Sequence, residues 1–211
     1  MSTLSSSIVM RRVVAPLLAM AVSWTLLPDG AALAATAERG NSALKAGVFE
    51  PPRPAPDFAL RGSDGAELKL SRYRGKVVLM SFGFTSCPAV CPITLATLAD
   101  ARRALGSAAD AVQVIFVTVD PERDDAARLK AYLAGFDPTF VGATGSPDGL
   151  AAVRRNYGVT AEKQVVSGGD YVMNHSSSIY LIDRSGRLRA LMPYGRAAGD
   201  FVHDVQLLLA Q

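Results

Sequence analysis

The sequence predicts an α/β domain built on a central mixed β-sheet flanked by helices, with a β-hairpin at its N-terminal end. Strand and helix patterns alternate between residues 76 and 158, and a second hairpin pattern and one amphipathic helix follow them. Near-continuous apolar runs among these patterns are typical of strands buried on both faces of a sheet. Composition agrees, since 49% hydrophobic and 19% charged residues in a chain of 211 indicate a globular protein with a large core.

The first half of the domain supplies the N-terminal hairpin and two buried strands. The short runs PDFAL and AELKL flank the polar turn RGSDG, which is typical of a hairpin. GKVVLMSFGF and VQVIFVTVD are the two apolar runs that predict buried strands. Between them, PITLATLADARRAL has apolar residues at helical spacing, and we expect this helix to stop before Gly106.

The second half predicts two further helices, a short strand, a hairpin and a closing helix. RDDAARLKAYLAGF predicts a helix with acids in its first turn, where they complement the helix dipole. FVGAT predicts a short strand, and Ser146 followed by Pro147 predicts the start of the next helix. SSIYLID and RLRALMPY flank RSG as a tight hairpin, and AGDFVHDVQLLLAQ predicts the closing amphipathic helix.

The N-terminus has the pattern of an export signal. Arg11 and Arg12 precede the uncharged apolar run 13–27, and Ala32-Leu33-Ala34 follows as a small-x-small cleavage site. We expect residues 1–34 to be a secretory signal peptide or an uncleaved N-terminal anchor, and residues 35–53 to be a flexible tether. The domain is then expected to span residues 54–211. The predicted location is the periplasm or the outer face of the inner membrane.

Charge identifies no partner. The formal net charge is +3, and no run of lysines or arginines alternates with aromatic residues. A nucleic-acid surface is therefore not expected.

The chain contains only two cysteines, Cys87 and Cys91, in the stretch FGFTSCPAVCPITLATL. A structural disulfide here would close a very small loop and remove little chain entropy, so it explains little. Because proline disfavours α conformation in the residue before it, we expect Cys91 to cap a helix that begins at Pro92. A helix N-terminus favours thiolates, which serve either disulfide exchange or the binding of a soft metal. The spacing alone does not decide between these two functions.

A metal site needs a third ligand, and the chain has two histidines. His203 lies in the closing helix, where an ordinary surface or core-rim histidine is the favoured interpretation. His175 lies in a polar loop just before a predicted strand, and a histidine without a role is its alternative interpretation. Two thiolates and one imidazole suit Cu(I), whereas structural zinc takes four ligands and would need His203 or a carboxylate as well.

Three separated blocks, GFTSCPAVCP, VTVDPERDD and NHSSSIYLID, resemble the Sco/SenC family of copper-binding proteins. The resemblance covers roughly residues 50–210. It implies a thioredoxin-like fold and a protein that delivers one copper ion, Cu(I) or Cu(II), to the CuA centre of cytochrome c oxidase. The expected partner is the copper-bearing subunit of that oxidase or another copper protein. The resemblance also implies that Cys87, Cys91 and His175 are the copper ligands, with Asp120 and Asn174 as candidate neighbours of the site.

Some members of this family are instead thiol–disulfide reductases, for which Cys87 and Cys91 would be the catalytic pair. Peroxide reduction is a third and weaker hypothesis, because TSC departs from the Thr-x-x-Cys block of thioredoxin-like peroxidases. The chain also departs from the family pattern at Ala89 and Asn174, where acids are usual, and it has no acid just after Pro92. These changes bear on copper affinity and on the partner, because residues around metal ligands tune the metal site.

Overall fold

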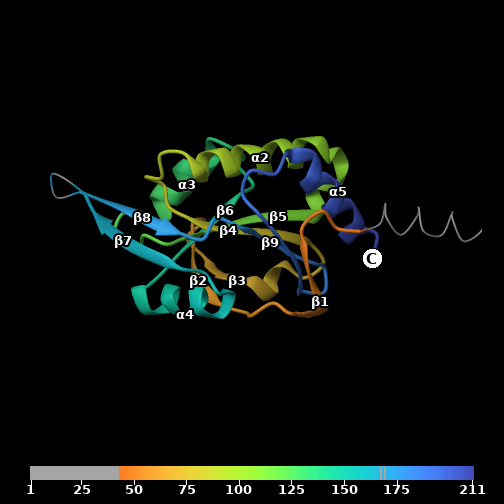
Figure 1. Ribbon diagram of the computed structural model, residues 1–211, viewed down its shortest axis with the longest axis horizontal. Helices are drawn as coiled ribbons and strands as arrows, with labels where there is room; N and C mark the ends of the chain where they lie inside the picture. The colour runs from red at the N-terminus through yellow and green to blue at the C-terminus, as the bar shows by residue number, and fades with distance from the viewer. Residues whose placement is uncertain (1–42, 167, 169) are drawn as a thin grey trace, which may run out of the picture. The chain divides into compact units, whose positions relative to one another are not determined.

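The computed structural model describes residues 43–166, 168 and 170–211 (Figure 1). The predicted signal and the first part of the predicted tether lie outside these residues. The main sheet has eight strands in the order β1-β10-β9-β4-β5-β6-β2-β3, and the strands β7 and β8 form a separate two-stranded sheet. Within the described ranges, no helix is both long and apolar enough to cross a membrane.

The centre of the sheet confirms the two predicted buried strands. β4 (Val77–Gly83) and β5 (Val112–Thr118) are buried along their whole length and run parallel, from Val77 opposite Val112 to Gly83 opposite Thr118. β6 (Val141–Thr144) continues parallel to β5, while β9 (Ile179–Ile182) is antiparallel to β4. The sheet is therefore mixed, as predicted. The C-terminal ends of its parallel strands lie on the same side of the sheet, where the chain turns into helices.

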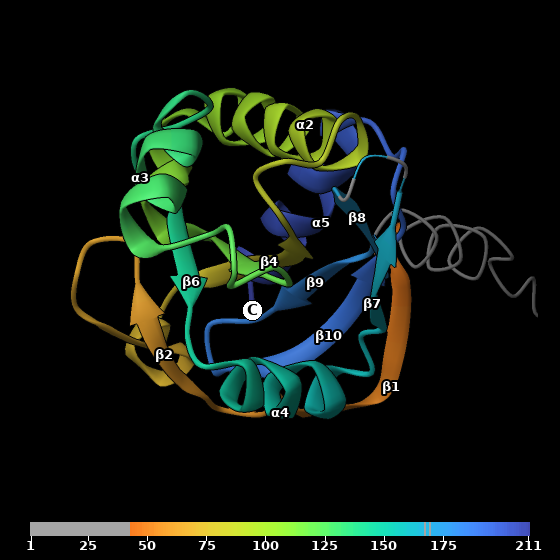
Figure 2. The ribbon, with the colours of Figure 1, turned by 90° about the vertical axis from the view of Figure 1, so that its left-hand side faces the viewer.

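Helices cover both faces of the sheet (Figure 2). α2 (Val90–Ala104), α3 (Ala126–Ala134) and α5 (Ala198–Leu209) lie on one face, and α2 packs against α5. α4 (Pro147–Tyr157) lies on the other face. Right-handed crossovers explain this division, because β4-α2-β5 and β5-α3-β6 advance in the same direction across the sheet.

The helix ends confirm the predicted cap at Ser146 and correct two other predictions about where helices begin. Ser146 caps α4 by accepting the Gly149 N–H at 3.2 Å, with Pro147 in the first turn. The acids of RDD precede α3, where Asp125 accepts the Arg128 N–H at 2.7 Å, and so they do not form its first turn. α2 begins at Val90, and Cys91 lies within its first turn and does not cap it. Since first-turn N–H groups have no partner within the helix, Pro92 fits there without being the first residue.

Both predicted hairpins are present. β2 (Ala59–Gly62) pairs antiparallel with β3 (Glu67–Lys69), and β10 (Arg187–Met192) pairs antiparallel with β9.

One edge strand and one hairpin of the described residues were not predicted. β1 (Gly47–Pro54) occupies the end of the predicted tether and pairs antiparallel with β10 at the edge of the sheet, where prolines are tolerated. β7 (Ala161–Val165) and β8 (Tyr171–His175) form a hairpin where the sequence predicts a polar loop, so His175 ends a strand. Most side chains of β1 and β7 face solvent, so neither strand has the apolar pattern that marks a buried strand.

Candidate metal centre

The two cysteines and His175 lie close together near the C-terminal end of β4, although the histidine lies 84 residues from Cys91 in sequence. Cys87 and Cys91 follow β4, and His175 ends β8. One ligand atom from each residue lies within 4.8 Å of the other two, and Cys91 Sγ is 3.7 Å from His175 Nε2. These residues therefore offer two sulfurs and one nitrogen to a single ion.

The two sulfurs have different surroundings. Cys91 is only 3% exposed, whereas Cys87 is half-buried. Burial raises the pKa of the Cys91 thiol, which corrects the expectation that the helix N-terminus favours its thiolate. Cys87 Sγ instead accepts the Cys91 N–H, at 3.4 Å, so the helix end points a donor at the more exposed sulfur. A metal bound at Cys91 must displace its proton.

Gly83, the last residue of β4, makes room for the buried sulfur. A Cβ at this position would lie 2.6 Å from Cys91 Sγ and 2.7 Å from the ring of Phe116. Real Cβ contacts are essentially never this short. A side chain of any size at residue 83 would therefore crowd both the sulfur and the aromatic ring.

The histidine ring is oriented for metal binding. Nδ1 of His175 lies 2.8 Å from the carbonyl oxygen of Ser176, so a proton on Nδ1 is donated to that oxygen and Nε2 keeps its lone pair. Nε2 is the atom that faces Cys91 Sγ. The ring also packs edge-on against Phe84, with 5.8 Å between centroids. Such a hydrogen bond on the second nitrogen is a usual feature of metal-binding histidines.

The other residues singled out in the sequence are not among the three whose ligand atoms converge. Asp120 is 2% exposed and accepts hydrogen bonds from Arg123 Nε at 2.5 Å and from Tyr171 Oη at 2.8 Å. Asn174 is exposed on the face of β8 opposite His175, so the structure does not bring it to the ligand atoms. His203 lies on α5 with its Nδ1 2.9 Å from Asp204.

A buried carboxylate that was not predicted supports the segment before the cysteines. Asp124 is fully buried and accepts the Thr85 N–H at 3.0 Å, the Thr85 hydroxyl at 2.6 Å and the Thr118 hydroxyl at 2.7 Å. These bonds tie the chain just before Cys87 to the end of β5. The only signal in the sequence was the cluster of acids in VTVDPERDD, which does not reveal which acid turns inward.

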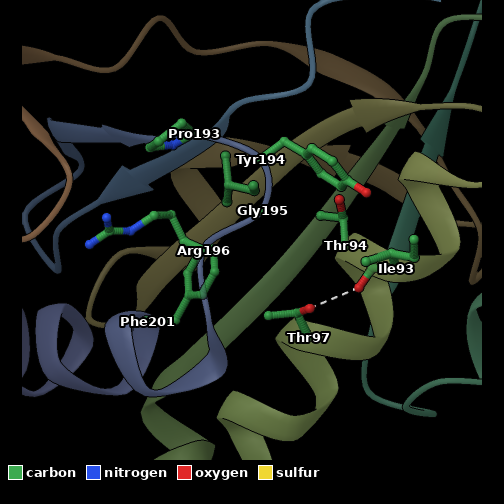
Figure 3. Close-up of a pocket in the computed structure, with 9 residues that line it drawn as sticks. Ile93, Thr94, Thr97, Pro193, Tyr194, Gly195, Arg196 and Phe201 are labelled. Carbon is green, nitrogen blue, oxygen red and sulfur yellow. Dashed lines mark hydrogen bonds between the residues drawn. The ribbon is translucent and has the colours of Figure 1, made fainter.

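A pocket lies beside α2, the helix that carries Cys91, and none of the three ligand residues lines it (Figure 3). It lies between α2 and the segment that joins β10 to α5, with Ile93 on one side and Tyr194 and Arg196 on the other. Ile93 and Tyr194 are among the exposed large apolar side chains. The pocket has no cysteine, histidine or carboxylate in its lining, so its chemistry is distinct from that of the metal centre.

Fold and site together define a thioredoxin-like domain that presents two thiols and one imidazole near the end of a central strand. Two sulfurs and one nitrogen are a donor set typical of proteins that bind soft metals. The family model described as SCO1/SenC matches residues 49–210. The chain belongs to the SCO1/SenC family, and the predicted family and fold class are confirmed.

Curated relatives share more than a third of the aligned residues. The mouse mitochondrial SCO2 homolog is 37% identical over 162 residues, which are 73% of this chain and 62% of the mouse protein. The mitochondrial SCO1 homolog 1 of Arabidopsis thaliana is 35% identical over 173 residues, which are 81% of this chain and 48% of that protein. The chain thus spans about half to two thirds of the length of these relatives.

Solved structures with the same fold include copper-bound relatives. Copper-bound ScoI of Bradyrhizobium japonicum is 38% identical, with a TM-score of 0.69, and the match covers 74% of this chain and 99% of that one. Apo Sco1 of Thermus thermophilus is 36% identical, with a TM-score of 0.70, covering 80% of this chain and 98% of that one.

Proposed function

We propose that this protein binds one copper ion through Cys87 Sγ, Cys91 Sγ and His175 Nε2 and passes it to a copper protein outside the cytosol. The observation that carries the proposal is the convergence of these three atoms within 4.8 Å. Soft sulfur ligands select Cu(I), and a set of three donors matches its low coordination. The copper-bound structure of the B. japonicum relative supports copper as the ion.

The acceptor we infer is the CuA-bearing subunit of cytochrome c oxidase. Support comes from a solved relative at 25% identity, BsSco, which is described as a member of the Sco family of cytochrome c oxidase assembly proteins. Copper passes by ligand exchange, and Cys87 and His175 are the half-buried ligands whereas Cys91 is buried. The ligands of the acceptor therefore approach from the side of Cys87 and His175. The export pattern of residues 1–34 supports the periplasm or the outer face of the inner membrane as the place of this exchange.

An anaerobic Cu(I) titration of the reduced protein against a competing chelator tests the site. We expect one tightly held copper per chain in the wild type, and a large loss of affinity in Cys87→Ser, Cys91→Ser and His175→Ala. His203→Ala is the matched control, because it removes a histidine that lies on α5 outside the site, and it should bind copper like the wild type. Tight binding that survives His175→Ala would exclude the three-ligand site.

Thiol–disulfide exchange is the second candidate function. Both cysteines are free thiols, and Cys87 is accessible while accepting the Cys91 N–H. In this reaction Cys87 thiolate attacks a partner disulfide, forming a mixed disulfide and releasing one partner thiol. Cys91 then attacks the mixed disulfide, so the partner leaves with two thiols and the protein holds a Cys87–Cys91 disulfide. An exported dithiol donor must return the pair to its reduced form. The disulfide switch described for BsSco favours including this candidate.

The role of His175 separates the two functions. The reductase reaction uses both cysteines and needs no imidazole, so His175→Ala should reduce a model disulfide as fast as the wild type. Copper binding needs the imidazole as its third ligand. Measuring both activities on His175→Ala and on Cys91→Ser therefore assigns the chemistry of the pair.

A further inference from the structure

The strand that carries His175 is not part of the main sheet. β7 and β8 pair only with each other among the described strands, from Ala161 opposite His175 to Val165 opposite Tyr171. Figure 1 shows this hairpin extending beyond the edge of the main sheet. An isolated two-stranded hairpin is marginally stable in water. Side-chain contacts with the domain must therefore contribute to holding it in place.

Tyr171 and His175 share one face of β8. Residues 171, 173 and 175 are half-buried, while residues 172 and 174 are exposed, which is the alternation of a strand with one face on the protein. Met173, between them on this face, packs against the hydrophobic core. A strand is stiff over five residues, so whatever fixes Tyr171 also constrains the position of His175.

Tyr171 and four side chains around it form what we call the Tyr171 clamp, which comprises Tyr171 and Lys163 from the hairpin and Asp120, Glu122 and Arg123 from the segment after β5. The Tyr171 ring lies between two cations, with Arg123 Cζ and Lys163 Nζ each 3.8 Å from its centroid. Its hydroxyl donates to Asp120 Oδ1 at 2.8 Å. Lys163 Nζ reaches Glu122 Oε2 at 2.6 Å, which joins β7 to the same segment.

Arg123 connects the clamp to the backbone of β8 and to the site. Its Nε pairs with the buried Asp120, and its Nη1 donates to the carbonyl oxygen of Tyr171 at 3.1 Å. Its Cζ is also 5.7 Å from the ring centroid of Phe84, the residue that packs against His175. Desolvation and the hydrogen bond to Asp120 raise the pKa of Tyr171 to about 12, so the hydroxyl stays a donor at neutral pH.

Resting on the copper site proposed above, we propose that Tyr171 is a positioning residue, which holds the β7–β8 hairpin so that His175 faces the two cysteines before copper arrives. The apparent affinity of a site is its intrinsic affinity multiplied by the fraction of molecules in which the site is assembled. The clamp raises that fraction. Loss of groups that orient metal ligands typically lowers metal affinity about 10- to 100-fold, and we expect Tyr171→Ala to fall in this range.

Two measurements on the purified chain test the clamp. In the metal-free protein, Tyr171→Ala should speed amide hydrogen exchange in β7 and β8 about tenfold or more, with the central strands β4 and β5 unchanged. In the Cu(I) titration, the same variant should lose affinity. Tyr171→Phe keeps the ring and its contacts with the two cations and loses the hydroxyl's bonds to Asp120 and Glu122, so its effects should be intermediate. Val172→Ala is the matched control, since Val172 is the neighbouring exposed residue of β8, and it should match the wild type.

A double-mutant cycle separates positioning from general loss of stability. Because the clamp acts on copper through His175, adding Tyr171→Ala to His175→Ala should cause no further loss of Cu(I) affinity. An equal loss in both backgrounds would overturn the proposal, and so would hydrogen exchange in the hairpin that Tyr171→Ala leaves unchanged. If the wild type does not use His175 for copper, the proposed function fails, while the exchange measurement still decides whether Tyr171 holds the hairpin.

Discussion

Substituting Gly83 with alanine tests how closely the buried sulfur is fitted to the sheet. The added Cβ would lie 2.6 Å from Cys91 Sγ, whereas ordinary contacts begin at 3.4 Å, so the two atoms must separate by about 0.8 Å. The ring of Phe116 would be 2.7 Å from the same Cβ. Phe116 is 1% exposed in the middle of β5 and has little space to move into. We expect the sulfur, on the first turn of α2, to move away from the new Cβ, and the crowded ring of Phe116 to add to the loss of stability.

Two consequences follow from this displacement. Overpacking a filled core costs about 1–3 kcal/mol of unfolding free energy, so Gly83→Ala should be less stable than the wild type by this amount. Metal–ligand distances tolerate deviations of about 0.2 Å, so a sulfur moved several times that far should weaken Cu(I) binding about tenfold or more. Urea unfolding measures the first effect, and the chelator-competition titration measures the second.

Gly142→Ala is the matched control, because it crowds another buried glycine in the same sheet away from the cysteines. Its Cβ would lie 2.8 Å from Leu129 Cβ and 3.1 Å from Leu133 Cδ1. We expect this variant to lose stability and keep its Cu(I) affinity. If Gly83→Ala also loses stability while keeping the wild-type affinity, the sulfur is not constrained by residue 83 and our account of the site is wrong.

Two further predictions concern buried carboxylates. Asp124→Ala leaves the neutral donors on Thr85 and Thr118 without their buried acceptor, so we expect urea unfolding to show a loss of at least about 1–3 kcal/mol, the cost of one buried unsatisfied donor, and a loss below about 1 kcal/mol would contradict this role. At Asp183, desolvation raises the pKa, but hydrogen bonds from Ser185, Arg187 and Arg189 outweigh it and hold the pKa below its ordinary value. A lowered pKa stabilises the fold above the unfolded pKa of about 3.9 and loses this effect as the carboxylate is protonated. Asp183→Asn should therefore be less stable than the wild type at pH 7, and the difference in unfolding free energy should shrink below about pH 4. A difference of the same size at pH 2 would refute this account of Asp183.

The core of the fold could be predicted from the sequence because burial leaves a periodic pattern. β4 and β5 are buried on both faces, so every residue is selected for the interior and the runs GKVVLMSFGF and VQVIFVTVD are almost uninterrupted. β1 and β7 have no such pattern. They are mostly exposed, and pairing with β10 and β8 stabilises them, which no local sequence property reveals.

The structure brings together the three residues that the sequence and the resemblance single out as candidate ligands, whereas the protonation of Cys91 was not predicted. The spacing of Cys87 and Cys91 brought both sulfurs to one turn, and the resemblance supplied His175. The expectation of a thiolate at Cys91 failed because the helix dipole was weighed without burial, and the 3% exposure of this residue could not be known before the packing of α2 on the sheet. The contacts of Tyr171 with Asp120, Glu122 and Arg123 were equally out of reach, because those three residues lie about 50 residues away in the chain.

The segment 120–124 explains why three distant sequence blocks occur together in this chain. Its last residue, Asp124, binds Thr85 and so fixes the chain that leads into the two cysteines. Its first residue, Asp120, binds the hydroxyl of Tyr171 and so fixes the strand that ends at His175. The two cysteines follow β4 of the main sheet and the imidazole belongs to a separate hairpin, and within the described residues this short segment contacts the supports of both. A change in its backbone would shift the cysteines and the histidine relative to each other, so the geometry of the metal centre depends on residues that do not touch the metal.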